Sequence, residues 1–176
     1  MGHSIQGFVA LESDLNEIFS VFRAAHVVPL AQNFAFVPMT AELYEEICAR
    51  PDFLDDVADA RFLRLSSAVF QFGRKISLKT PVAYVETDYF GGDGFQRAIA
   101  WRDGDFRFGP AVYGREAGIQ IDRGDQHPIN RALQEIGVRG YLMEDEDETP
   151  KDEFEELGLD RFRSNADWIA SRGDRW

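Results

Sequence analysis

The sequence predicts a single α+β domain over residues 1–176, with an antiparallel sheet and helices packed on one side of it. Three observations lead to this fold class. β-Forming runs follow one another in the middle of the chain while helical patterns lie before and after them, a segregation typical of α+β proteins. No internal repeat or low-complexity linker divides the chain. Its 44% hydrophobic residues suffice for a core, since a chain of this length buries roughly 70% of its unfolded surface.

The N-terminal residues predict a strand followed by a helix. Residues 5–11 form a short apolar run that is typical of a strand. Asp14 supplies an N-cap with Glu17 three residues later, and this pair predicts a helix over residues 14–26. The apolar residues of that helix recur at helical spacing: Leu15, Ile18, Phe19, Phe22 and Ala25.

A second strand and a second helix are expected next. Residues 34–37 are apolar and predict a short strand. Thr40 is placed to cap a helix over residues 41–49. Cys48 belongs to the apolar stripe of this helix, so we expect it in the core rather than at a reactive site.

A third helix is predicted from Ser66, the expected N-cap, to Leu78. Val69, Phe72 and Ile76 in the interval recur at helical spacing and support it. Gly73 weighs against it, because glycine disfavours the interior of a helix.

The central part of the chain gives the strongest prediction, a three-stranded antiparallel meander over residues 82–109. Residues 82–90 are rich in β-formers, and residues 95–102 alternate between two faces after a glycine-rich turn. Asp103 and Gly104 form a two-residue hairpin signal, after which the chain returns as the third strand. The glycine-rich turn lacks the Gly-Lys-Ser/Thr ending of a phosphate loop.

Residues after the meander predict a hairpin and a helix. Residues 112–113 and 119–121 favour a further hairpin at the edge of the sheet. Pro128 suits the first position of a helix that runs to Ile136 and stops at Gly137.

The C-terminal part predicts a strand, a short helix and a docked tail. Residues 138–143 are apolar again and predict a terminal strand. A short acidic helix is expected to begin near Pro150 and to end at Gly158. Three large apolar residues then indicate that the tail docks on the body: Phe162, Trp168 and Ile169.

The chain is strongly acidic, with 31 Asp and Glu against 19 Lys and Arg and a formal net charge of −12. Residues 144–176 form an acidic C-terminal segment that holds 12 acidic and 5 basic residues. Such a run is typical of a solvated loop, and it also suits electrostatic attraction of a basic protein partner. The candidate partner-binding residues are Glu144, Asp145, Glu146, Asp147, Glu148, Asp152, Glu153, Glu155 and Glu156.

Several classes of function are disfavoured. The acidic charge argues against binding to nucleic acid or to an anionic membrane. The sequence also shows no apolar run of membrane-spanning length, no secretory signal and one cysteine, so we expect a cytoplasmic protein. We expect no cofactor and no metal site, because the histidines lie far apart in the sequence: His3, His26 and His127. No complete catalytic constellation is present, which favours a protein that is not an enzyme.

An alternative is a small enzyme or a small-molecule-binding protein with a pocket beside the 82–109 meander. Glu86 and Asp88 lie two residues apart on a strand and therefore share a face, as paired acid and base carboxylates require. Arg97 is the third residue expected to line this pocket.

Two motifs resemble those of small bacterial proteins. The first is a strand ending Tyr-Phe-Gly-Gly-x-Gly at residues 89–94, followed by Gln96, an alanine and Trp101. The second is the Ile-Asn-x-Ala-Leu run at residues 129–133, which leads to Gly137-Val138. Proteins with these motifs are similar in size and style to immunity proteins of bacterial polymorphic and contact-dependent toxin systems. The resemblance implies a non-enzymatic inhibitor whose partner is a toxin domain, and it leaves a homo-oligomer open.

Overall fold

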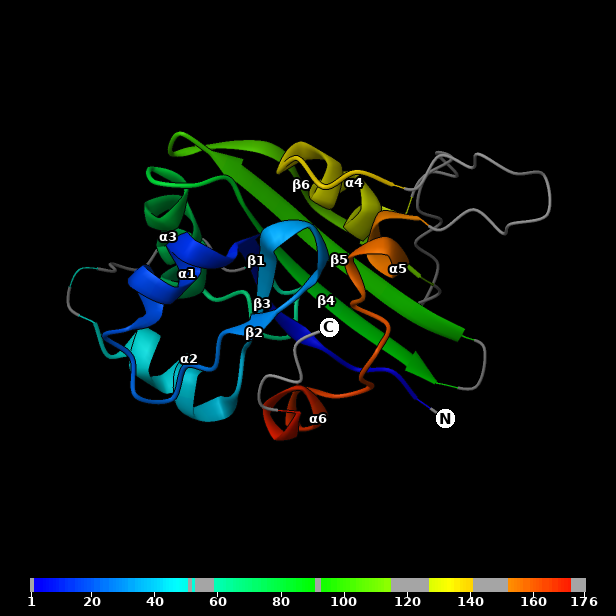
Figure 1. Ribbon diagram of the computed structural model, residues 1–176, viewed down its shortest axis with the longest axis horizontal. Coiled ribbons are helices and arrows are strands. Elements are labelled where there is room, and N and C mark those ends of the chain that lie inside the picture. Colours follow the sequence, from blue (N-terminus) through cyan, green and yellow to red (C-terminus); the bar gives the residue numbers. More distant parts are fainter. Residues whose placement is uncertain are drawn as a thin grey trace.

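The computed structural model describes residues 2–50, 52, 59–90, 93–114, 127–140 and 152–171. Six strands form one antiparallel sheet in the order β2-β3-β1-β4-β5-β6 (Figure 1). The strands are β1 (Gln6–Leu11), β2 (Val28–Pro29), β3 (Phe34–Pro38), β4 (Val82–Phe90), β5 (Asp93–Arg102) and β6 (Asp105–Tyr113). The helices are α1 (Glu12–Phe19), α2 (Ala41–Cys48), α3 (Ser67–Ser77), α4 (Pro128–Glu135), α5 (Glu153–Leu157) and α6 (Asn165–Ala170), with a 3₁₀ turn, η1, at Ala31–Asn33. The predicted α+β class is confirmed.

The predicted meander is strands β4, β5 and β6. β4 and β5 pair along their length, from Val82 opposite Trp101 to Phe90 opposite Asp93. Asp103 and Gly104 both have positive φ, 56° and 80°, as a tight two-residue hairpin turn requires. The third strand is longer than expected and ends at Tyr113, so residues 112–113 complete it. Residues 119–121 lie outside the described residues.

The helices lie on both faces of the sheet, whereas the sequence led us to expect them on one. One core lies under α1, α2 and α3 and includes Phe8, Tyr84 and Trp101. The other lies under α4, α5 and α6 and includes Val9 and Val85. Adjacent strand residues thus point into different cores, and a sheet with two apolar faces needs helices on both. Figure 1 shows the two helical groups at different parts of the sheet.

Local capping signals gave correct starts for α2 and α3. The Thr40 hydroxyl accepts a hydrogen bond from the N–H of Leu43 at 3.1 Å. The Ser66 hydroxyl accepts one from the N–H of Val69 at 3.3 Å. Each bond satisfies a backbone donor that the first helical turn leaves free. Cys48, which we expected in the core, is exposed at the end of α2.

The first helix is shorter than predicted. It begins at Glu12, before the expected cap Asp14, and ends at Phe19 rather than near residue 26. Phe22 continues the helical spacing but lies beyond the end of the helix. It is nevertheless buried, because it packs on Phe19 and on Phe72 at ring-centroid distances of 5.6 and 5.2 Å. The apolar spacing therefore identified a core residue correctly and its secondary structure wrongly.

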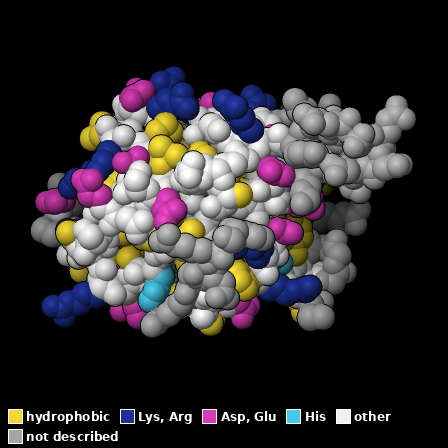
Figure 2. Space-filling model, viewed as in Figure 1, with side chains coloured by type: hydrophobic (Ala, Val, Ile, Leu, Met, Phe, Trp, Pro, Cys, Tyr) yellow, Lys and Arg dark blue, Asp and Glu magenta, His cyan; other side chains and the backbone are white. Residues whose placement is uncertain are grey.

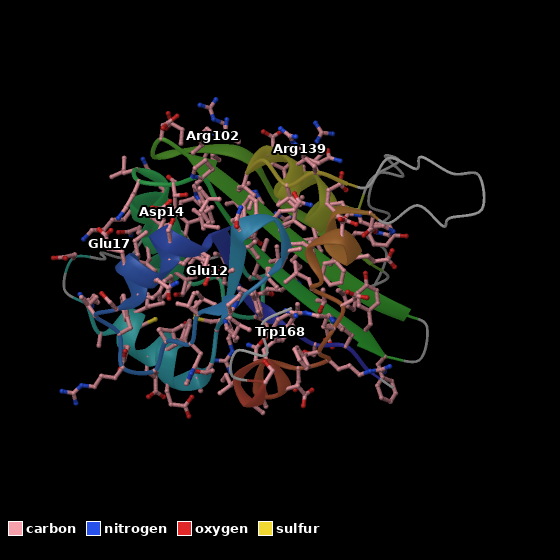
Figure 3. The ribbon with its side chains drawn as sticks, in the orientation of Figure 1. Glu12, Asp14, Glu17, Arg102, Arg139 and Trp168 are labelled. Carbon is pink, nitrogen blue, oxygen red and sulfur yellow. The ribbon has the colours of Figure 1, made fainter. Side chains whose placement is uncertain are left out.

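The described part of the C-terminal tail, up to residue 171, packs on the body as predicted. Trp168 of α6, labelled in Figure 3, is fully buried against Phe36 of β3 and against Phe162. Residues 138–140 are not part of a strand, and residues 141–143 of the predicted terminal strand lie outside the described residues. No helix in the described part of the chain has the length and apolar character to cross a membrane.

Gly73 shows why a glycine stands inside α3. A Cβ at this position would lie 2.8 Å from the Trp101 ring. Alanine normally stabilises a helix interior by about 1 kcal/mol relative to glycine. For Gly73→Ala we expect instead a loss of about 1–3 kcal/mol in the free energy of unfolding, because the methyl group overpacks the core. Urea unfolding measures this change.

The control is the same substitution with a smaller ring opposite. In a Trp101→Phe background the methyl group has room, so Gly73→Ala is expected to be neutral or stabilising relative to that background. A gain in stability from Gly73→Ala in the natural chain would contradict the close packing of Gly73 on Trp101.

Candidate functional site

The candidate acidic residues divide into a described and an undescribed part. Asp152 is the N-cap of α5, and Glu153, Glu155 and Glu156 belong to the helix itself. Glu144–Glu148 lie outside the described residues. In the view of Figure 2, acidic side chains lie at the surface in the region of α5. The structure thus gives a geometry to four of the nine candidate residues.

Asn130 of α4 holds the start of α5 in place. Its side chain is buried, and its Nδ2 donates to Asp152 Oδ2 at 2.8 Å while its Oδ1 accepts from the N–H of Phe154 at 3.1 Å. Asp152 Oδ1 in turn accepts from the N–H of Glu155 at 3.0 Å. In the sequence, Asn130 stands out only as part of the Ile-Asn-x-Ala-Leu motif. An asparagine between apolar helix residues was the signal of a buried polar contact.

Two further contacts secure α5 on the sheet. Gln134 of α4 donates from Nε2 to Glu153 Oε1 at 2.7 Å. Leu157, at the end of α5, is fully buried in the core beneath α4. These contacts fix α5 and its N-cap Asp152 to the body of the protein, although the helix has only five residues. We call α5, Asp152 and their contacts with α4 the α5 platform.

The four carboxylates of Asp152 and α5 are not paired with a basic side chain in the part of the chain that the structure describes. Within the described residues, none of Asp152, Glu153, Glu155 and Glu156 forms a salt bridge. Asp152 and Glu155 are exposed, and the other two are half-buried. Their negative charges add to one another at short range, which raises the local field above that of a mixed surface.

The alternative set on the meander has a different geometry. Glu86 of β4 is fully buried and lies opposite Arg97 of β5, which is 6% exposed. Glu86 Oε2 and Arg97 Nη1 are 4.0 Å apart. Asp88 is exposed two residues further along β4. The fold thus brings Glu86 and Arg97 together as a buried pair and leaves Asp88 in solvent.

Glu86 ties the segment before α3 to the sheet. Its Oε2 accepts from the N–H of Leu63 at 2.7 Å, and its Oε1 accepts from the N–H of Arg64 at 2.8 Å. The Tyr84 hydroxyl donates to Oε1 at 3.2 Å. Burial raises the pKa of Glu86, and the two backbone N–H groups and Arg97 oppose that rise. This use of both carboxylate oxygens favours a structural role.

His3 lies where the N-terminus and the C-terminal segment meet. Its Nδ1 is 2.8 Å from Thr87 Oγ1, and its ring packs edge-on against Phe154 with centroids 5.7 Å apart. The neighbouring Ser4 donates its N–H to the carbonyl of Arg163 at 2.7 Å. Burial lowers the pKa of His3 below its usual 6.5. Its Nε2 is buried without a hydrogen-bond partner among the described residues.

No metal centre is evident in the part of the chain that the structure describes. There, no group of three or more His, Cys, Asp or Glu side chains is placed to hold a metal ion. Two surface hollows adjoin each other beside α3, and neither Glu86 nor Arg97 lines them.

Comparisons of the chain with family models, with curated proteins and with solved structures gave no match. The function is therefore inferred from the geometry of this chain.

Replacing Glu86 with Gln tests the structural role. The amide offers one acceptor oxygen where two backbone N–H groups each need one, and it leaves Arg97 buried without a counter-charge. We expect the free energy of unfolding to fall by about 3–5 kcal/mol, as measured by urea unfolding. The control is Asp88→Asn, on the same strand and face but exposed, which we expect to stay within about 0.5 kcal/mol. An unchanged or more stable Glu86→Gln variant would point to a functional pocket instead.

His3 predicts a loss of stability in mild acid. Because its pKa is lower in the folded than in the unfolded state, the unfolded chain binds more protons below about pH 6.5. Its contribution to stability is present above that pH and is lost as the pH falls towards the folded-state pKa. We expect His3→Asn to flatten the decline in the free energy of unfolding between about pH 7.5 and pH 5.5. The raised pKa of Glu86 changes stability with pH in the opposite direction, and it does so in the natural chain and in His3→Asn alike. Curves of unfolding free energy against pH that run parallel for these two proteins would contradict this role for His3.

Proposed function

We propose that this protein is a non-enzymatic binding protein that recognises a basic protein partner through the acidic surface of α5 and the acidic run at residues 144–148. The observation that carries the proposal is the platform of α5. Asn130, Gln134 and Leu157 fix this short helix to the body, while its three carboxylates and that of its N-cap Asp152 have no salt-bridge partner among the described residues. A fixed, uncompensated charge cluster speeds encounter with a surface of opposite sign.

The resemblance to immunity proteins narrows the proposed partner to a toxin domain with a basic face. If that toxin is a nuclease, the carboxylates would occupy the cleft that binds the phosphates of its substrate, and binding would neutralise it. The same charge would repel nucleic acid from this surface. We place this activity in the cytoplasm, where a chain with one cysteine needs no disulfide.

The test removes charge without disturbing the platform. Glu155→Gln with Glu156→Gln deletes two charges and leaves the contacts of Asp152 and Glu153 with α4 intact. We expect association with the basic partner to slow by about threefold to tenfold at low salt, and its dependence on salt to flatten. Replacing Glu144–Glu148 with Ser or Gln is expected to do the same. The partner is captured with the tagged chain, produced separately, and its association rate is measured at low and moderate salt.

The matched control is Glu42→Gln with Glu45→Gln on α2. Both residues are exposed, and their substitution removes the same charge from a helix on the opposite face of the sheet. We expect the control to associate at nearly the natural rate. Equal rates and equal salt dependence for the natural chain and both acidic variants would show that the α5 surface does not bind the partner.

A further inference from the structure

A hollow of about 270 Å³ lies between the end of α1 and α3, on the face of the sheet opposite α5. Its apolar lining comes from two segments that are distant in the sequence. Ile18 and Val21, with Phe22, come from α1 and the turn after it, and Phe72 and Ile76 come from α3. Val21 is 64% exposed, so apolar surface reaches the rim of the hollow.

The charged residues that line the hollow are mostly basic. The lining holds the cations of Arg50, Lys75 and Lys79 and the carboxylate of Asp52, and Glu17 adds a second carboxylate beside Lys79. Lys75 Nζ lies 3.6 Å from Asp52 Oδ2. Lys79 Nζ lies 2.5 Å from Oε1 of Glu17, which Figure 3 labels on α1. This local excess of positive charge stands out in a chain whose net charge is −12.

Arg50 is the cation with the greatest capacity left for a ligand. Its guanidinium stacks over the Phe22 ring, 4.4 Å from the centroid. Among the described residues its side chain makes no hydrogen bond and no ion pair. A guanidinium stacked on an aromatic ring keeps its N–H groups pointing outward in the plane, where they match a carboxylate with two parallel hydrogen bonds.

A second hollow of about 310 Å³ adjoins the first and shares Asp52 and Lys75 with it. It adds the side chain of Leu78, which is 70% exposed, and that of Arg74, whose Nε donates to the carbonyl of Gly104 at 2.9 Å. The apolar and basic character of the first hollow therefore continues past Lys75.

From this pattern we infer that the α1–α3 hollow binds a small amphiphilic carboxylate, with its apolar chain on Phe22, Phe72 and Ile76 and its carboxylate on Arg50. Ligand pockets usually measure about 300–1,000 Å³, so the volume suits a medium-chain fatty acid rather than a larger lipid. The negative charge of the whole protein repels anions at long range, which leaves local ion pairing and apolar contact to hold the ligand. This site is independent of the proposed α5 surface.

Octanoate and octan-1-ol are the probes, since they share a chain and differ in charge. We expect octanoate to shift backbone amide NMR signals of α1 and α3, and to bind about tenfold more tightly than octan-1-ol. Arg50→Gln is expected to weaken octanoate binding about fivefold and to leave octan-1-ol unaffected. Lys79→Gln provides a second variant with the same expected direction. The matched control is Arg23→Gln, because Arg23 is an exposed cation next to Phe22 that does not line the hollow. This substitution should change the binding of neither octanoate nor octan-1-ol.

Four results would overturn the inference. Octanoate shifts absent from α1 and α3 would show that the hollow does not take this ligand. Equal binding of octanoate and octan-1-ol, or unchanged octanoate binding by Arg50→Gln, would show that the basic rim does not recognise a carboxylate. A concentration-dependent dimer that Val21→Asp abolishes would show that the hollow is an interface between two copies of the chain.

Discussion

The inner strands β3, β1, β4 and β5 are packed on both faces, so each of their buried apolar residues has to suit one of two cores. Phe8, Tyr84 and Trp101 point to one side, and Val9, Val85 and Ala100 point to the other. A slip of one residue in register would exchange the two sets, because side chains alternate across a strand. The same requirement dictates helices on both faces and leaves no solvated face for a polar site at the centre of the sheet.

Glu86 is the place where a charge enters this apolar arrangement. It follows Val82 and Tyr84 on the face of α1–α3, at the end of that core, where the segment before α3 crosses the sheet. Backbone N–H groups from this segment need acceptors, and the carboxylate provides two. The energetic cost of burying the charge is thus offset by hydrogen bonds that also anchor the entry to α3. Two acidic residues on one face of a strand suggested a catalytic acid and base. Glu86 is instead buried in structural hydrogen bonds, while Asp88 is exposed to solvent.

Local signals predicted most of the fold, and contacts between distant segments account for what they missed. Thr40, Ser66 and the Asp103-Gly104 turn act within a few residues, so their roles follow from the sequence alone. Phe22, Gly73 and Asn130 are explained by partners elsewhere: Phe72, Trp101 and the start of α5. For the candidate site, the acidic run in the sequence predicts that the acids of α5 bind a partner, and this stays a prediction. The platform beneath them depends on α4, and the basic hollow depends on α1, α3 and Arg50, which no local pattern brings together.

Net charge is a sum over the surface, and this fold shows why it is a poor guide to a single face. The α5 face carries carboxylates without salt-bridge partners in the described part of the chain, while the α1–α3 face carries a hollow with three cations and one carboxylate. The two-sided sheet keeps these surfaces on opposite sides of two cores. At physiological salt the Debye length is about 8 Å. A single helix with its side chains is about 10–12 Å across, so the outer surfaces of a sheet covered by helices on both faces lie farther apart than that. Each face therefore presents its own field to a ligand, and a protein of net charge −12 can offer a binding site for an anion.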